Sequence, residues 1–453
     1  RKEGSAYDLP LAIGMLGASE VIRPDKLNRY LLMGELSLDA ACNPSRSITH
    51  CHKSKRAWLE GIIIPKQNTR EAAVVNNLKV YGAGNLKEVI EFFNDKQELE
   101  LVHVDTRKEF YTQQNSFDLD FSDVKGQENV KRALEVAAAG GHNILLVGAP
   151  GSGKSMLAKR LPSILPPLSL GESLETTKIH SVAGKLGEGS GLISKRPFRD
   201  PHHTISTTAM TGGGSFPQPG EISLAHNGVL FLDELPEFNR NVLEVLRQPL
   251  EDRKITISRV KCNVEFPTSF TLVASMNPCP CGYYNHPTKA CVCNPGQVQR
   301  YLNRISGPLL DRIDIQIEIV PVPFEKISEK QQAESSASIR ERVICARKMQ
   351  EKRFANHPGV YCNAQMESRL LHLYAEPDEQ GLNLLRNAMT RLNLSARAYD
   401  RILKVARTIA DLDHSEQVTS IHWQKHQLQK SRQGELGRLS LPQPFHNRIE
   451  WIV

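Results

Sequence analysis

The feature that most constrains this chain is a short apolar run that leads directly into a glycine-rich turn. Residues Ile144 to Val147 have the length and branching of a buried strand. The next eight residues fit the pattern G-x-x-x-x-G-K-[ST], whose glycines let backbone N–H groups turn towards a phosphate chain. These residues are Gly148, Ala149, Pro150, Gly151, Ser152, Gly153, Lys154 and Ser155. A strand before the loop and a helix after it favour nucleoside triphosphate binding over a chance glycine-rich turn.

Two side chains of this loop predict contacts with the nucleotide and its metal ion. Lys154 adds a positive charge at the outer phosphates, and Ser155 offers a hydroxyl to Mg²⁺. Upstream, Gly126 and Gln127 form a turn before a helix, and we expect this turn to lie against the base. The predicted cofactors are therefore ATP and Mg²⁺.

Two later apolar runs end in polar residues that suit hydrolysis. The run Gly228 to Leu232 ends in Asp233 and Glu234. Asp233 can hold Mg²⁺ through water, and Glu234 can polarise the water that attacks the γ-phosphate. The run Phe270 to Met276 ends in Asn277, which can orient that water or simply form an Asn-Pro turn.

One arginine follows these strands at a position that can serve a neighbouring subunit. Arg312 lies between an apolar helix and a strand, where it can stabilise transition-state charge in the next ATP site of a ring. The alternative for Arg312 is an ion pair within its own subunit. Strand, phosphate loop, acidic strand, asparagine strand and arginine, in this order, describe an AAA+ ATPase with an α/β fold.

Four further segments narrow the group. Arg196 to His203, Gly212 to Gly214, Pro219 to Glu234 and Asn277 to Gly282 closely resemble the Mg-chelatase-like ATPases of the YifB/ComM family. The resemblance spans most of residues 1 to 412. It implies an ATPase core over 121–324 and a helical lid over 325–453 with an atypical tail. It also implies a homo-oligomeric ring, expected to be a hexamer.

The resemblance extends to a second arginine and to two insertions in the core. Arg397 resembles the second sensor of this clade and would reach the γ-phosphate, the alternative being a surface ion pair. His180 to Gly220 would be a helix-2 insert facing the pore of the ring, and Glu251 to Phe266 alternates as a hairpin should. The candidates for DNA phosphate contacts in these insertions are Arg196, Arg199, Arg253, Lys254, Arg259 and Lys261. The alternative for each is a solvated basic face.

The first 115 residues suggest a separate α+β domain. Lys2 to Asp8 and Gly34 to Leu38 resemble the proteolytic domain of Lon-type proteases, which has a ribosomal S5 domain 2-like fold. Ala6 stands where the nucleophile would be and Thr49 where the lysine would be, and neither can perform that chemistry. We therefore predict a degenerate, non-proteolytic domain. Because the chain begins without a methionine inside this motif, we expect the domain to be truncated at its N-terminus.

Four of the nine cysteines cluster in two C-x-C pairs, Cys279 with Cys281 and Cys291 with Cys293. Four thiolates can form a closed tetrahedral Zn²⁺ site, in which His286 could replace one ligand. Free thiols are the alternative. The odd number of cysteines, and the absence of an apolar run of about 18 residues, favour a reduced, cytoplasmic location without a membrane span.

Two functions remain compatible with these features. The first is an ATP-driven ring motor on DNA, such as a branch-migration helicase in recombination during natural transformation, as the family resemblance implies. The second is a chelatase-like or chaperone-like ATPase that remodels a protein partner without DNA. The basic insertions favour DNA, whereas the formal net charge of +7 permits an anionic partner without requiring one.

Overall fold

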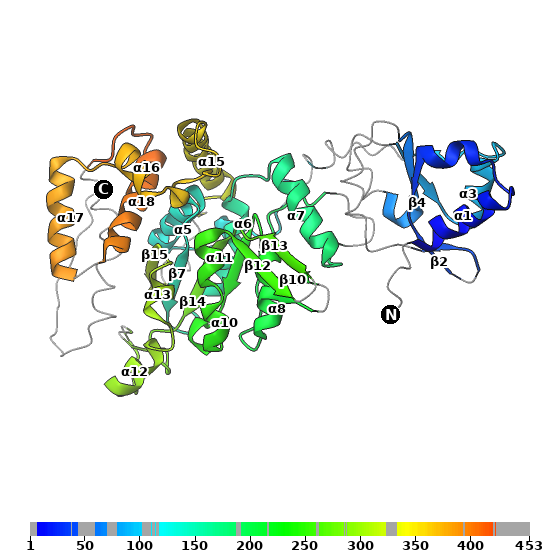
Figure 1. Ribbon diagram of the computed structural model, residues 1–453. Helices are drawn as coiled ribbons and strands as arrows, with labels where there is room; N and C mark the ends of the chain where they lie inside the picture. The colour runs from blue at the N-terminus through cyan, green and yellow to red at the C-terminus, as the bar shows by residue number, and fades with distance from the viewer. Residues whose placement is uncertain are drawn as a thin grey trace.

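A parallel five-stranded sheet forms the centre of the molecule, as the computed structural model shows (Figure 1). The described residues are 7–37, 39–43, 59–69, 79–101, 110, 114, 117–186, 192–214, 217–259, 262–284, 286, 288–322, 333–392, 395–419 and 422. In spatial order the strands are β15 (Ile315–Ile319), β7 (Ile144–Gly148), β14 (Thr271–Met276), β11 (Val229–Leu232) and β8 (Phe198–Arg199). All residues of β7, β14 and β11 are buried, as expected for strands covered on both faces. The predicted α/β class and the three predicted strands are confirmed.

Helices cover both faces of this sheet. Ile144 and Leu146 of β7 pack into one apolar cluster, whereas Leu145 and Val147 pack into the other. This alternation follows from the period of two in a strand. The first cluster includes side chains of α5 (Glu128–Gly140), α6 (Lys154–Ile164), α15 (Ser336–Phe354) and α18 (Ala396–Leu412). The second includes α8 (Thr207–Thr211), α9 (Glu221–Leu224), α10 (Arg240–Glu244), α12 (Pro295–Leu302) and α13 (Gly307–Leu310).

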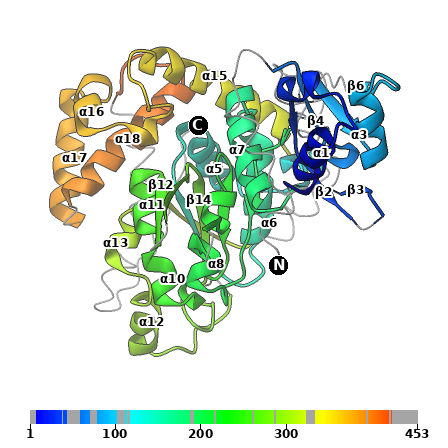
Figure 2. The ribbon, with the colours of Figure 1, turned by 45° about the vertical axis from the view of Figure 1, so that its right-hand side comes forward.

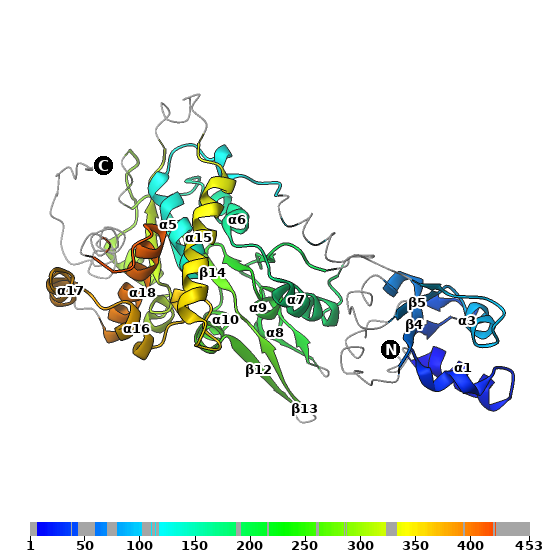
Figure 3. The same cartoon turned by 90° about the horizontal axis from the view of Figure 1, so that it is seen from above.

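The insertion that was expected to form a hairpin does so. Strands β12 (Lys254–Arg259) and β13 (Cys262–Pro267) pair antiparallel directly after α11 (Arg247–Asp252). Ile255 and Ile257 pack on the core at the base of the hairpin. The two strands then extend away from the core (Figure 3). The other insertion, His180 to Gly220, begins in the last turn of α7 (Leu170–Val182) and contains β8, α8 and the short pair β9 (Gly212–Gly213) and β10 (Gln218–Pro219).

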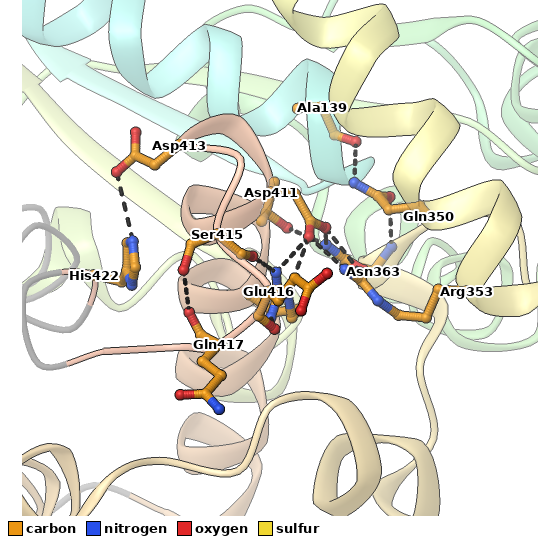
Figure 4. A network of polar contacts seen from close by, with 12 residues as sticks. Ala139, Gln350, Arg353, Asn363, Asp411, Asp413, Ser415, Glu416, Gln417 and His422 are labelled. Atoms are coloured by element: carbon orange, nitrogen blue, oxygen red, sulfur yellow. Dashed lines mark hydrogen bonds and ion pairs between the residues drawn. The ribbon is translucent and has the colours of Figure 1, made fainter.

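From Ser336 onward the described elements are helices, which besides α15 and α18 include α16 (Ser368–Tyr374) and α17 (Glu379–Leu392). Of these, α16 and α17 lie at the left in Figures 1 and 2. A buried polar network joins α15, the turn at Asn363 and α18 (Figure 4). At its centre, Asp411 accepts hydrogen bonds from Arg353, Asn363 and Arg407. The atypical tail predicted from about residue 424 lies outside the described residues.

The N-terminal residues have a core of their own. Helices α1 (Asp8–Ala18) and α3 (Leu86–Phe93) pack with a sheet that has both parallel and antiparallel neighbours. Its strands are β1 (Tyr30–Leu32), β4 (Gly61–Pro65), β5 (Lys79–Ala83) and β6 (Glu100–Leu101), and β2 (Glu35–Leu36) pairs separately with β3 (Cys42–Asn43). Ala6 and Thr49 lie outside the described residues, so the likeness to Lon proteases stays a prediction. None of the helices that the structure describes is long and apolar enough to cross a membrane.

Candidate ATP site

The phosphate-binding loop connects the carboxyl end of β7 to the first turn of α6. A Cβ atom on Gly148 would lie 2.7 Å from the Ser152 hydroxyl and 2.8 Å from the carbonyl oxygen of Ile319. Gly151 and Gly153 have φ angles of +76° and +89°. Glycine is therefore required by a close approach at the first position and favoured by left-handed backbone at the other two. The N-terminus of α6 points into this loop, as an anion site requires.

The Lys154 ammonium lies inside the loop. It donates hydrogen bonds to the carbonyl oxygens of Gly148 and Ala149 at 2.7 and 2.9 Å, and to Oδ1 of Asn277 at 3.1 Å. Burial lowers the pKa of Lys154, while the carboxylates of Asp233 and Glu234 oppose that shift. The structure thus brings the predicted lysine, acids and asparagine together at one edge of the sheet.

The predicted Mg²⁺ ligands are adjacent. The Ser155 hydroxyl donates to Oδ2 of Asp233 at 2.7 Å, and the Ser275 hydroxyl also bonds the Asp233 carboxylate. Hydroxyl and carboxylate oxygens suit Mg²⁺, so these residues fit the ion that the family resemblance implies. Ser275 was not predicted, because a serine inside an apolar strand gives no signal of its own.

Glu234 follows Asp233 in left-handed backbone, with φ of 54° and ψ of 49°. Such conformations in residues other than glycine cluster at functional sites. Its carboxylate Oε2 lies 3.7 Å from Nδ1 of His203. The His203 ring in turn contacts Phe238. Sequence reasoning treated His203 only as part of a family marker and missed its proximity to Glu234.

The turn before α5 reaches the same loop. Gly126 and Gln127 both have positive φ angles, of 65° and 59°. The Gln127 amide donates to the carbonyl oxygen of Ser152 at 2.9 Å. The Ser152 hydroxyl and Oε1 of Gln127 are buried without a hydrogen-bond partner in the structure. Buried polar atoms normally find partners, so these two fit a ligand-binding site.

Arg312 lies at the other end of the sheet. Its carbonyl oxygen accepts from the side chain of Asn143, which precedes β7, whereas Lys154 follows the carboxyl end of that strand. The Arg312 guanidinium pairs with Glu251 at 2.5 Å and donates to Pro308 at 2.6 Å. Five strand residues separate the two edges by roughly 16 Å. The structure therefore does not bring Arg312 to the ATP site of its own chain.

Arg397 is exposed in the first turn of α18, where it is the second residue of the helix. One turn later, Arg401 lies 3.7 Å from Asp314. Burial lowers the pKa of Arg401, and the ion pair with Asp314 opposes that shift. The positive charges of Arg312 and Arg397 lower the pKa of Arg401 further. Arg312 thus lies at the amino edge of the sheet, apart from Lys154, and Arg397 lies one turn before Arg401, which faces the same edge through Asp314.

Two of the DNA-binding candidates are already paired within the chain. The Arg196 guanidinium contacts Glu172 and donates to the carbonyl oxygens of Pro166 and Asn227. Arg199 forms a two-pronged pair with Glu221 at 2.6 and 2.7 Å. These two side chains hold the insertion together, so their guanidinium groups are already engaged within the chain.

The other four candidates belong to the hairpin β12–β13 and its base. Lys254 is exposed and pairs with Glu265 on the opposite strand. Arg253 lies at the base of the hairpin, where it donates to Ser269 at 3.3 Å. The backbone of Arg259 pairs with that of Cys262 near the tip, whereas Lys261 lies outside the described residues. The hairpin thus presents the exposed Lys254 on a projecting element.

The four clustered cysteines converge. The sulfur atoms of Cys279, Cys281, Cys291 and Cys293 all lie within 4.8 Å of one another. His286 is turned to its own loop, since its Nδ1 accepts from the backbone N–H groups of Thr288 and Lys289. Of the two predicted ligand sets, the structure assembles the one made of cysteines.

Family comparisons agree with this geometry. The family model described as magnesium chelatase, subunit ChlI, matches residues 120–327, and the model of its C-terminal part matches residues 333–426. A third model, subunit ChlI of Mg-chelatase, matches residues 1–68.

Similar proteins cover nearly the whole chain. The uncharacterized protein YifB of Escherichia coli is 44% identical over 432 residues, which cover 94% of this chain and 81% of that protein. The competence protein ComM of Haemophilus influenzae is 42% identical over 427 residues, covering 93% of this chain and 81% of ComM. The magnesium-chelatase 38 kDa subunit of Cereibacter sphaeroides is 25% identical over 35% of this chain and 52% of that subunit.

Proposed function

This chain belongs to the Mg-chelatase-like ATPase family that includes the YifB and ComM proteins, and on that premise we propose that it hydrolyses ATP to move on DNA. The observation that carries the ATPase part is the contact of Lys154 with Asn277 beside the Ser155–Asp233 pair. Lys154 and Ser155 begin α6, whereas Asp233 and Asn277 follow the ends of β11 and β14, yet all four meet at one edge of the sheet. Such convergence is what phosphoryl transfer needs, because its catalysis consists mainly of positioning and charge stabilisation.

Each residue of the site has a separate role in ATP hydrolysis. The loop N–H groups and Lys154 bind the phosphates, and Ser155 with Asp233 would hold Mg²⁺. Bound Mg²⁺ would neutralise charge on the phosphates. Glu234 accepts a proton from the attacking water, and Asn277 orients that water. His203 holds the Glu234 carboxylate in place.

The DNA part of the proposal rests on the hairpin β12–β13. It projects from the ATPase core and carries Arg253, Lys254, Arg259 and Lys261 (Figure 3). Contacts of lysine and arginine with phosphates are independent of sequence and weaken with salt. The similarity to a protein named competence protein ComM supports a DNA substrate such as a branched recombination intermediate. Six copies in a ring would place the hairpins around a central pore.

Branch migration of labelled four-way DNA tests this proposal. Wild type should move the branch in an ATP-dependent reaction, whereas Lys154→Ala should fail to bind ATP and Glu234→Gln should bind it but hydrolyse it about 10²- to 10⁴-fold more slowly. A triple Lys254→Ala, Arg259→Ala, Lys261→Ala variant should keep its basal ATPase activity and lose DNA affinity at about 0.1 M salt.

The competing function is the remodelling of a protein partner, which the similarity to a magnesium-chelatase subunit supports. It predicts ATP hydrolysis with neither DNA binding nor branch movement. That result for wild type would overturn the DNA motor and leave the ATPase assignment intact.

A further inference from the structure

The four-cysteine cluster has the dimensions of a tetrahedral metal site. Cys279 Sγ lies 3.3 Å from Cys281 Sγ and 3.7 Å from Cys291 Sγ, and the latter two sulfurs are 3.5 Å apart. Zn²⁺ bound by four thiolates at about 2.3 Å places the sulfurs about 3.8 Å apart. Disulfides would require about 2.05 Å, so the structure describes four free thiols around a common centre.

The surrounding loop needs such a constraint. Between Met276 and Pro295 the described residues form neither a helix nor a strand. Long connections without secondary structure are uncommon inside compact domains and are often functional. Cys279 is fully buried and the other three cysteines are half-buried, so the cluster lies inside the loop and not on its surface.

The beginning of this loop touches the phosphate-binding loop. Cys279 follows Asn277 by two residues, and the Asn277 side chain accepts from Lys154. Gly282 has a φ of +83°, and a Cβ atom there would lie 2.4 Å from Cδ of Pro150. The backbone directly after Cys281 therefore packs on Pro150, in the middle of the phosphate-binding loop.

The end of the loop returns to the same asparagine. Asn294, the residue after Cys293, caps α12 by accepting from the backbone of Gln297. On that helix, Tyr301 is buried, with its phenol facing the backbone of Asn277. Burial raises the pKa of Tyr301 to about 12, so the phenol stays protonated. Both ends of the cysteine loop thus meet at Asn277.

We propose that Cys279, Cys281, Cys291 and Cys293 bind one Zn²⁺ ion, and that this ion fixes the loop that holds Asn277 and Pro150 in place. All four ligand positions are occupied by cysteine, so the site is structural. The metal site itself does not depend on the proposed function. The effect of the metal on the ATP site rests on the proposed ATPase function.

Metal analysis of the full-length chain tests the site itself. Purified wild type should contain one zinc per chain, and replacement by Co²⁺ should give the visible and charge-transfer bands of tetrahedral Co²⁺–thiolate. Cys293→Ser should lose both, whereas Cys345→Ser, a change at an exposed cysteine outside the cluster, should keep both. Lys154→Ala should also keep the metal. Wild type without zinc and without Co²⁺ bands after reconstitution would overturn the proposal.

The link to the ATP site needs a second comparison, which uses binding of a fluorescent ATP analogue. Removal of zinc from wild type by a chelator should weaken binding about ten-fold or more, because small displacements of positioning groups have large effects. Zinc should restore the affinity. Gly282→Ala should keep the metal but bind ATP more weakly, since the new methyl group meets Pro150. Unchanged affinity in both the zinc-free protein and Gly282→Ala would refute the link while leaving the metal site standing.

Discussion

At the scale of single residues, the position of Glu234 depends on a neighbour that sequence patterns do not reveal. The left-handed backbone at Glu234 directs a carboxylate that is more than half exposed, and His203 lies 3.7 Å from it. An exposed carboxylate samples several rotamers unless a partner selects one. We therefore regard His203 as a positioning residue.

Replacement of His203 by alanine should lower kcat for ATP hydrolysis about ten-fold and leave KM nearly unchanged, because only the water-activating group is displaced. Steady-state kinetics would show this split. The matched control is His203→Ala in a Glu234→Gln background, where no further loss is expected. An equal loss in both backgrounds would mean that His203 acts through something other than Glu234.

Asp314 gives a pH-dependent prediction at the same scale. It is buried, accepts from the backbone N–H of Asn143, and faces His142 and Arg401. Burial alone would raise the pKa of Asp314, but its hydrogen bond and ion pairs lower it to about 2. The unfolded value is about 3.9, so the carboxylate contributes about 2 to 3 kcal/mol of stability above that pH. This contribution is lost as the pH falls towards 2.

The difference in melting temperature between wild type and Asp314→Asn should therefore be largest at pH 6 to 7 and should narrow below about pH 4. Thermal unfolding from pH 7 to pH 3 measures it, and the comparison cancels the other acid-sensitive groups. A difference that stays constant over this range would show that Asp314 is not ionised in the way described.

The residues of the site also show which contacts can be predicted from the sequence and which cannot. Lys154 and Ser155 could be predicted because their roles depend on backbone turns between neighbouring residues. Asp233 and Asn277 could be predicted because the carboxyl ends of parallel strands share one edge. The partners of Arg196 and Arg312 lie 24 and 61 positions away, at Glu172 and Glu251, and no local period encodes them. Arg196 is left out of the proposed DNA surface because it pairs with Glu172, a contact that only the fold creates.

At the scale of helices and strands, the polar network around Asp411 fixes how the C-terminal helices join the core (Figure 4). Asp411 has no exposed surface, and its carboxylate pairs with Arg353 and Arg407. Asn363 links it to Thr408, which meets His142 just before β7. A hydrogen-bonded chain thus runs from α18 towards the strand that carries the phosphate-binding loop.

Asp411→Ala should lower the free energy of unfolding by about 3 to 5 kcal/mol, because it leaves two arginines buried without their carboxylate. Asp413→Ala offers a matched control two residues away. Asp413 is partly exposed and pairs with Arg132, so its removal should cost less than about 1 kcal/mol. Urea unfolding monitored by circular dichroism compares them, and equal losses would argue against the network as the main link.

At the scale of the whole molecule, the phosphate-binding loop and Arg312 lie at opposite edges of one sheet. The phosphate-binding loop follows the carboxyl end of β7, while Arg312 lies at its amino end and Arg397 lies one turn before Arg401, the partner of Asp314. A single chain therefore presents an ATP site on one edge and arginines on the other. In a closed ring, each subunit would supply its arginines to the site of its neighbour.

Mixed rings test this arrangement. Neither Lys154→Ala nor Arg312→Ala should hydrolyse ATP as a pure ring. Mixed, they should regain part of the activity, because an intact loop from the Arg312→Ala subunit can meet an intact Arg312 from its neighbour. Absence of rescue in rings shown by mass spectrometry to be mixed would return Arg312 to a role within its own subunit, where it pairs with Glu251.

The same design decides which subunit Arg397 serves. If both arginines come from the neighbour, a mixture of Arg312→Ala and Arg397→Ala has no interface with both arginines, and activity should stay absent. If Arg397 instead served its own subunit, an Arg312→Ala site beside an Arg397→Ala neighbour would be complete, and activity would return. Because Arg397 is exposed one turn before Arg401, which pairs with Asp314 at the amino end of the sheet, we expect no rescue in this mixture, in contrast to the mixture with Lys154→Ala.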